Sequence, residues 1–159
     1  ANQYNYLDMF KKTFVLILFS LILSSCGYVP VYKGNMNLDY KISIMALSGD
    51  RDTGILINSK LKKFSKIKTG KNFKMTINTV YEKNIIAKDT TGKATDYQMK
   101  VVATFNVESE ELNKKIKITE TFNVKGLTNK FEEQRYDAII KNNMINAIIR
   151  KLTIQLSRN

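Results

Sequence analysis

Few side chains in this 159-residue chain can carry covalent or acid-base chemistry, and the most reactive of them is its single cysteine, Cys26. Histidine does not occur, which excludes a Ser-His-Asp triad, a Cys-His pair, an imidazole base and a histidine-ligated metal. One cysteine cannot form an internal disulfide or a multi-cysteine metal cluster. Two groups of carboxylates, Glu108, Glu110 and Glu111 in a connection and Glu132 with Glu133 in a helix first turn, lie where solvated carboxylates are usual. We therefore expect a binding or assembly protein that needs no metal or cofactor, and not an enzyme.

The segment before Cys26 has the layout of an export signal. Lys11 and Lys12 form a short basic region, and the apolar run TFVLILFSLIL follows at 13–23. A run of about 11 residues is much shorter than the ~20 that a helix needs to cross a bilayer. We predict a signal peptide over residues 1–25, in which 1–8 form an upstream extension if the natural start is Met9, and a single domain over 26–159.

The sequence Leu23-Ser24-Ser25-Cys26-Gly27 resembles the lipobox of bacterial lipoproteins. The resemblance implies cleavage before Cys26, a diacylglycerol on its thiol and an N-acyl chain on its new amino group. At ~0.8 kcal/mol per buried methylene, such chains hold a protein firmly in its membrane. Gly27, where an Asp would favour inner-membrane retention, points by the same resemblance to the outer membrane. The alternative is a cysteine that is removed with the signal, or an ordinary free thiol.

Lysine dominates the charged residues, since the chain has 26 Lys and Arg but only 14 Asp and Glu, and its net charge is +12. Such positive density attracts polyanions. Lys100, Lys115 and Lys117 are predicted on the polar face of a sheet, and the candidate polyanions are nucleic acid, an anionic membrane surface and the phosphorylated sugars of lipopolysaccharide. Nucleic acid is disfavoured by the few arginines, the inward-pointing aromatics and the export signal. A lysine-rich composition that only reflects AT-rich coding is the alternative.

Alternating apolar and polar residues predict four strands and two helices. The first strand, about 38–47, has Tyr40, Ile42, Ile44 and Ala46 on one face. Asp50 or Asp52 caps a helix of about 52–65. Three more strands are predicted at about 72–83, 97–107 and 116–124, with a turn over 83–92 and a polar hairpin connection over 108–113. A helix of about 130–156 follows, and Asn129 and Glu132 at its start resemble a capping box. This order, β-α-β-β-β-α, predicts an α+β two-layer α/β sandwich, with both helices on one face of a four-stranded, mostly antiparallel sheet.

The apolar positions of the C-terminal helix cover more than half of its circumference, whereas a surface helix needs a stripe of ~100°. Two explanations remain open. Either the helix packs on both the sheet and the first helix, or something outside the domain covers part of it.

Short matches along the chain resemble the alphaproteobacterial LPS-assembly lipoproteins, the LptE family. They are Cys26-Gly27-Tyr28-Val29-Pro30-Val31-Tyr32, Asp50-Arg51 leading into 55–61, Ala94-Thr95-Asp96-Tyr97, and Tyr136-Asp137-Ala138. The resemblance implies two helices on a four-stranded sheet and a lipid anchor at the periplasmic face of the outer membrane. It also implies a role as plug and assembly factor of an LptD-like β-barrel partner, with binding of lipopolysaccharide. For that binding we prefer Lys100, Lys115 and Lys117 as ligands of the lipid phosphates over the less rigidly placed lysines of 60–71. The scarcity of arginine departs from the family pattern.

Two other functions stay open. The first is a generic outer-membrane lipoprotein that acts as a scaffold or periplasmic binding module without a barrel partner. The second is an inner-membrane-tethered binder of nucleic acid or peptidoglycan, which requires residues 13–23 to stay uncleaved.

Overall fold

The computed structural model divides the chain into two units, Ala1–Met36 and Asn37–Asn159, and describes residues 40–67 and 70–158 of the second. Cys26, the lipobox-like sequence and the predicted signal peptide lie outside the described residues. The described elements are β1 (Tyr40–Gly49), α2 (Arg51–Leu61), the 3-10 helix η2 (Lys62–Lys66), β2 (Lys71–Lys88), β3 (Ala94–Glu108), β4 (Asn113–Lys125) and α3 (Lys130–Leu156).

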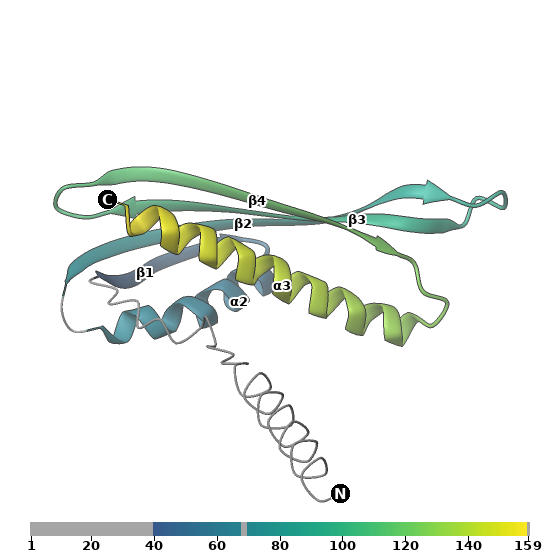
Figure 1. Ribbon diagram of the computed structural model, residues 1–159, viewed down its shortest axis with the longest axis horizontal. Coiled ribbons are helices and arrows are strands. Elements are labelled where there is room, and N and C mark those ends of the chain that lie inside the picture. The colour runs from purple at the N-terminus through teal and green to yellow at the C-terminus, as the bar shows by residue number, and fades with distance from the viewer. Residues whose placement is uncertain (1–39, 68–69, 159) are drawn as a thin grey trace, which may run out of the picture. The chain divides into compact units, whose positions relative to one another are not determined.

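The four strands form one sheet in the order β1-β2-β3-β4. β1 is parallel to β2, because α2 carries the chain back between them, whereas β2, β3 and β4 form an antiparallel meander. Both helices lie on one face of the sheet, as Figure 1 shows. The predicted element order, the mostly antiparallel sheet and the two-layer arrangement are therefore confirmed.

β1 departs from the predicted alternation after its first half. Its pairing with β2 shifts between Ile44 and Ala46, so that Met45 is an extra residue in the strand. An extra residue moves every following side chain to the other face. The prediction that Ala46 points into the core is therefore wrong, and Ala46 is exposed.

A tight junction joins β1 to α2. Asp50 is the N-cap of α2, and its side chain accepts a hydrogen bond from the backbone N–H of Thr53 at 2.8 Å. The backbone N–H of Asp50 donates to the carbonyl of Thr79 on β2 at 2.8 Å, so the cap is fixed to the sheet. Of the two predicted caps, Asp50 is the one that the structure uses.

β2 is longer than predicted and the following turn is shorter. The strand continues to Lys88, with irregular pairing after Ile85 and after Ala87, and the turn spans Asp89 to Lys93. The turn predicted over 83–92 is therefore wrong in its first half. β1 covers only the first part of this long strand, because its pairing with β2 ends at Thr79.

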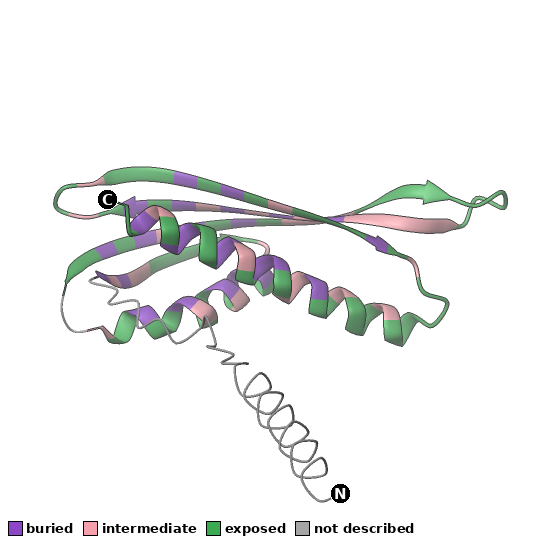
Figure 2. Cartoon of the chain, in the orientation of Figure 1, coloured by how far each residue is buried: buried purple, intermediate pink, exposed green. Residues whose placement is uncertain are grey.

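The core lies between the sheet and the two helices. On α3 the buried residues are confined to the C-terminal part, from Ile140 onward (Figure 2). Ile145, Ile149, Leu152 and Leu156, the positions that widen the apolar face, are all buried within the domain. Contacts of α3 with α2 as well as with β3 and β4 support packing on both neighbours as the explanation of that wide face. The largest fully buried side chains of the core are Phe73, Phe105, Ile42, Ile57, Leu61, Met75, Ile77, Met99, Ile145, Ile148, Leu152 and Leu156.

Candidate functional site

The outer face of the sheet, on the side away from the helices, carries the predicted lysines. Alternation places Lys115 and Lys117 of β4 on this face, because Ile116 and Ile118 point into the core. The cross-strand partners of these lysines on β3 are Asn106 and Thr104, respectively.

Lys115 and Lys117 are close neighbours. Two positions along a strand separate them by about 7 Å, and both side chains are exposed. Among residues 40–67 and 70–158, neither lysine has an ion-pair partner within 4.0 Å. Two adjacent uncompensated ammonium groups beside amide and hydroxyl neighbours can attract a phosphate-bearing ligand at this flat surface.

Lys100 lies on the same face but in a different electrostatic setting. Its Nζ lies 3.3 Å from Oε2 of Glu82, its direct cross-strand partner on β2. Its partner on β4 is Thr121, four positions from Lys117, so the two lysines are separated by about 13 Å along the strands. The structure thus brings two of the three predicted lysines together, and Glu82 partly compensates the third.

The second lysine group of the sequence, over 60–71, surrounds the end of α2 and the start of β2. Within it, Lys71 forms an ion pair with Glu111 at 3.3 Å, and Lys68 lies outside the described residues. A neighbouring hollow of about 660 Å³ is lined by both signs of charge. Its lining is Gly70, Lys71, Asn72, Lys74, Glu108, Ser109, Glu110 and Glu111. Three glutamates in this lining make it a poor site for a polyanion.

A second charged cluster lies between the sheet and α3, and the sequence did not predict it. Lys83 of β2 donates to Glu133 Oε1 at 2.7 Å and to Asp137 Oδ2 at 2.5 Å, and its Nζ lies 4.4 Å from the ring centre of Tyr97. Burial alone would lower the pKa of Lys83, but the two carboxylates outweigh it and the pKa is raised. Glu133, expected to be solvated, is therefore paired at a helix–sheet contact.

Lys141 makes the next contact along the same helix. Its Nζ lies 4.2 Å from the ring centre of Tyr81 and 3.4 Å from Oδ1 of Asp50. Hydrogen bonding by Thr53 is the main reason that the pKa of Asp50 is lowered, and Lys141 adds to the effect. The i, i+4 spacing of Glu133, Asp137 and Lys141 was the available sequence signal for a charged row on one helix face.

None of the helices in the described part of the chain has both the length and the apolar character needed to cross a membrane. Within the same residues, acidic side chains form no group of three or more that could hold a metal ion.

Comparison with known proteins gives the fold its class. No family model and no curated protein matches the sequence. Among solved structures, the rare lipoprotein B from Shewanella oneidensis is similar with a TM-score of 0.53 and 17% identity, over 73% of this chain and 96% of that chain. A lipoprotein from Caulobacter crescentus CB15 is similar with a TM-score of 0.53 and 8% identity, over 76% of this chain and 89% of that chain. At these identities the likeness shows the fold, which is one that solved bacterial lipoproteins adopt.

Proposed function

We propose that this chain is a lipoprotein of the LptE type, anchored through Cys26 at the periplasmic face of the outer membrane. The observation that carries the proposal is the shared fold with the rare lipoprotein B of Shewanella oneidensis, over nearly the whole of that chain. The lipobox-like sequence Leu23 to Gly27 supports the same proposal independently. The fold comparison rests on the described domain, whereas this match rests on the sequence of a segment outside it. In this proposal the chain plugs an LptD-like β-barrel and assists its assembly.

The second part of the proposal concerns lipopolysaccharide. Lys115 and Lys117 would meet the anionic phosphates of the lipid, with Asn106 and Thr104 beside them as hydrogen-bonding groups. The function is binding and assembly, so no catalytic residue and no cofactor is proposed besides the covalent acyl chains on Cys26.

The experiment uses the full chain with a C-terminal tag, extracted from the outer membrane in detergent. We expect a large β-barrel protein to co-purify in a 1:1 complex, and the mass of the N-terminal peptide to show a triacylated Cys26. The matched control is Cys26→Ala, which should lose the acyl chains and the outer-membrane fraction while the domain stays folded. A lipidated chain recovered alone would reject the barrel partner and keep the lipoprotein.

One observation favours the alternative of a lipoprotein scaffold without a barrel partner. Over Ile140–Leu156 the wide apolar face of α3 is buried within the domain itself, with Ile145 and Leu152 both fully buried. That part of the face therefore needs no partner, and a barrel would have to bind other surfaces. Recovery of the chain without a barrel is the result that selects this alternative.

A further inference from the structure

α3 is one continuous helix with two differently attached halves. Its eight buried residues all lie in Ile140–Leu156, and none lies in Lys130–Ile139. Figure 2 shows the same division, and in Figure 1 the helix diverges from the sheet toward its N-terminal end. Burial of apolar side chains therefore attaches the second half of α3 to the rest of the domain and contributes little to the attachment of the first half.

The first half, Lys130–Ile139, is attached to the sheet through Lys83. Glu133 and Asp137 are four residues apart, so they share one face of the helix, and the ammonium group of Lys83 bonds to both. The side chains of Lys83, Glu133 and Asp137 are 20 to 22% exposed, so water screens the contact only partly. Tyr97 on β3 adds a ring below the same ammonium group.

The contact depends on the lysine more than on either carboxylate. If Lys83 lost its charge, two partly buried carboxylates would remain side by side without a cation. Asp137 has no other hydrogen bond to compensate for the loss, because its second oxygen, Oδ1, is buried and has no hydrogen-bond partner among the described residues. Such a group is costly to leave uncompensated, so loss of the lysine favours movement of the helix into water.

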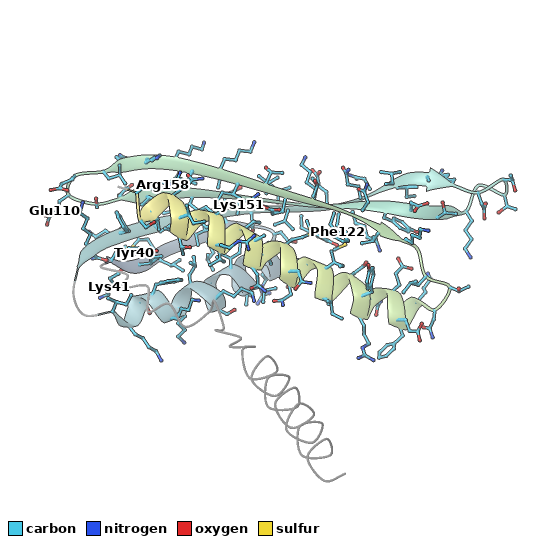
Figure 3. The ribbon with its side chains drawn as sticks, in the orientation of Figure 1. Tyr40, Lys41, Glu110, Phe122, Lys151 and Arg158 are labelled. Carbon is cyan, nitrogen blue, oxygen red and sulfur yellow. The ribbon has the colours of Figure 1, made fainter. Side chains whose placement is uncertain are left out.

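We propose that Lys130–Ile139 forms an arm that opens away from the sheet while Ile140–Leu156 stays packed, and that Lys83 is the latch that closes it. Opening exposes the ring of Tyr97 further and widens access to Phe122, which faces the helix side of β4 and is already 45% exposed (Figure 3). The inference does not depend on the proposed function, because it concerns how the domain moves and not what it binds.

Amide hydrogen exchange on the full-length chain tests the latch. In Lys83→Met, exchange of the amides of residues 134–139 should become about tenfold faster, while that of 144–156 stays unchanged. The matched control is Lys100→Met, which breaks a single ion pair, with Glu82, on the outer face and should change neither half. Lys83→Arg, which keeps the charge, should stay close to the unmodified chain.

A salt titration tests the same point without any substitution. Raising the salt from about 0.05 M to about 1 M shortens the screening length to about 3 Å and should speed exchange in 134–139 selectively. Equal exchange rates across the two halves of α3, or a uniform change along the whole helix in Lys83→Met, would overturn the proposal.

Discussion

Gly49 lies against the backbone of Thr79 so closely that a Cβ at position 49 would come within 1.9 Å of the Thr79 carbonyl oxygen. Its φ of +86° is also a conformation that residues with side chains rarely adopt. The contact occurs where β1 ends and the chain turns into α2, so the junction between the two layers depends on the absence of a side chain here.

We therefore predict that Gly49→Ala lowers the free energy of unfolding by at least about 2 kcal/mol, since strain and a backbone clash add together. Gly92→Ala is the matched control, because Gly92 has a similar φ of +83° but a Cβ added there would meet nothing within 4 Å. It should cost about 1 kcal/mol. Urea unfolding measures both, and equal losses would show that the close approach to Thr79 contributes nothing.

The cap of α2 gives a prediction about pH. The pKa of Asp50 is lowered from its ordinary value of 3.8, mainly through hydrogen bonding by Thr53, so the folded state favours the ionised carboxylate. The cap's full stabilisation is present above the unfolded-state pKa and is lost as the pH falls through the lower folded-state pKa. Asp50→Ala should lower stability by about 1 kcal/mol at neutral pH.

Asp50→Asn separates the hydrogen bond from the charge. Asparagine caps helices well, so this variant should lose less than Asp50→Ala at neutral pH and should lack the acid-dependent contribution of Asp50. Urea unfolding from neutral pH to about pH 3 distinguishes the three chains. If Asp50→Asn kept the full acid dependence of the parent chain, the assignment to Asp50 would be wrong.

Two phenylalanines on the helix side of the sheet should differ greatly in their contribution to stability. Phe105 of β3 is fully buried, whereas Phe122 of β4 is 45% exposed. Phe105→Ala should cost about 3–5 kcal/mol, because it opens a cavity in the core. Phe122→Ala should cost roughly 1 kcal/mol, in proportion to the smaller area it removes from water. Thermal and urea unfolding compare them, and similar losses would contradict the burial pattern.

The outer-face lysines give a binding prediction. Neutralising both neighbours, in Lys115→Gln with Lys117→Gln, should weaken binding to lipopolysaccharide vesicles by about 1 kcal/mol per lysine at low salt. Lys100→Gln should have a smaller effect, because Glu82 already compensates that charge. Flotation or fluorescence titration at several salt concentrations provides the measurement, and unchanged binding of the double variant at low salt would reject the site.

Much of the fold could be predicted from the sequence, because the spacing of apolar residues along a single segment distinguishes a strand from a helix. The alternation of Tyr97 to Val107 and the capping by Asn129 gave the third strand and the start of α3, and the structure confirms both. The failure at Met45 has a physical cause. There an irregular pairing interrupts the alternation, and irregular pairing is a property of two strands together. The length of β2 was missed for a related reason, because residues beyond Lys83 are held in the strand by pairing with β3 and not by a clear alternation of their own.

The candidate site could be predicted only in part for a similar reason. The placement of Lys115 and Lys117 on the polar face followed from alternation alone. The pairing of Lys100 with Glu82, and of Lys83 with Glu133 and Asp137, depends on strand register and on the position of α3. These ion pairs join residues that are 18 to 54 positions apart in the sequence, and no pattern within a single strand or helix predicts them.

The early end of β1 has a consequence for self-association. Beyond Thr79 no strand of the described chain pairs with the outer edge of β2, and an open strand edge is a template on which further copies can aggregate. The irregular pairing after Ile85 and the inward-pointing charge of Lys83 both disfavour such edge-to-edge addition. Lys83 therefore protects against aggregation as well as holding α3, and its replacement by methionine should lower the concentration at which the protein begins to form larger particles.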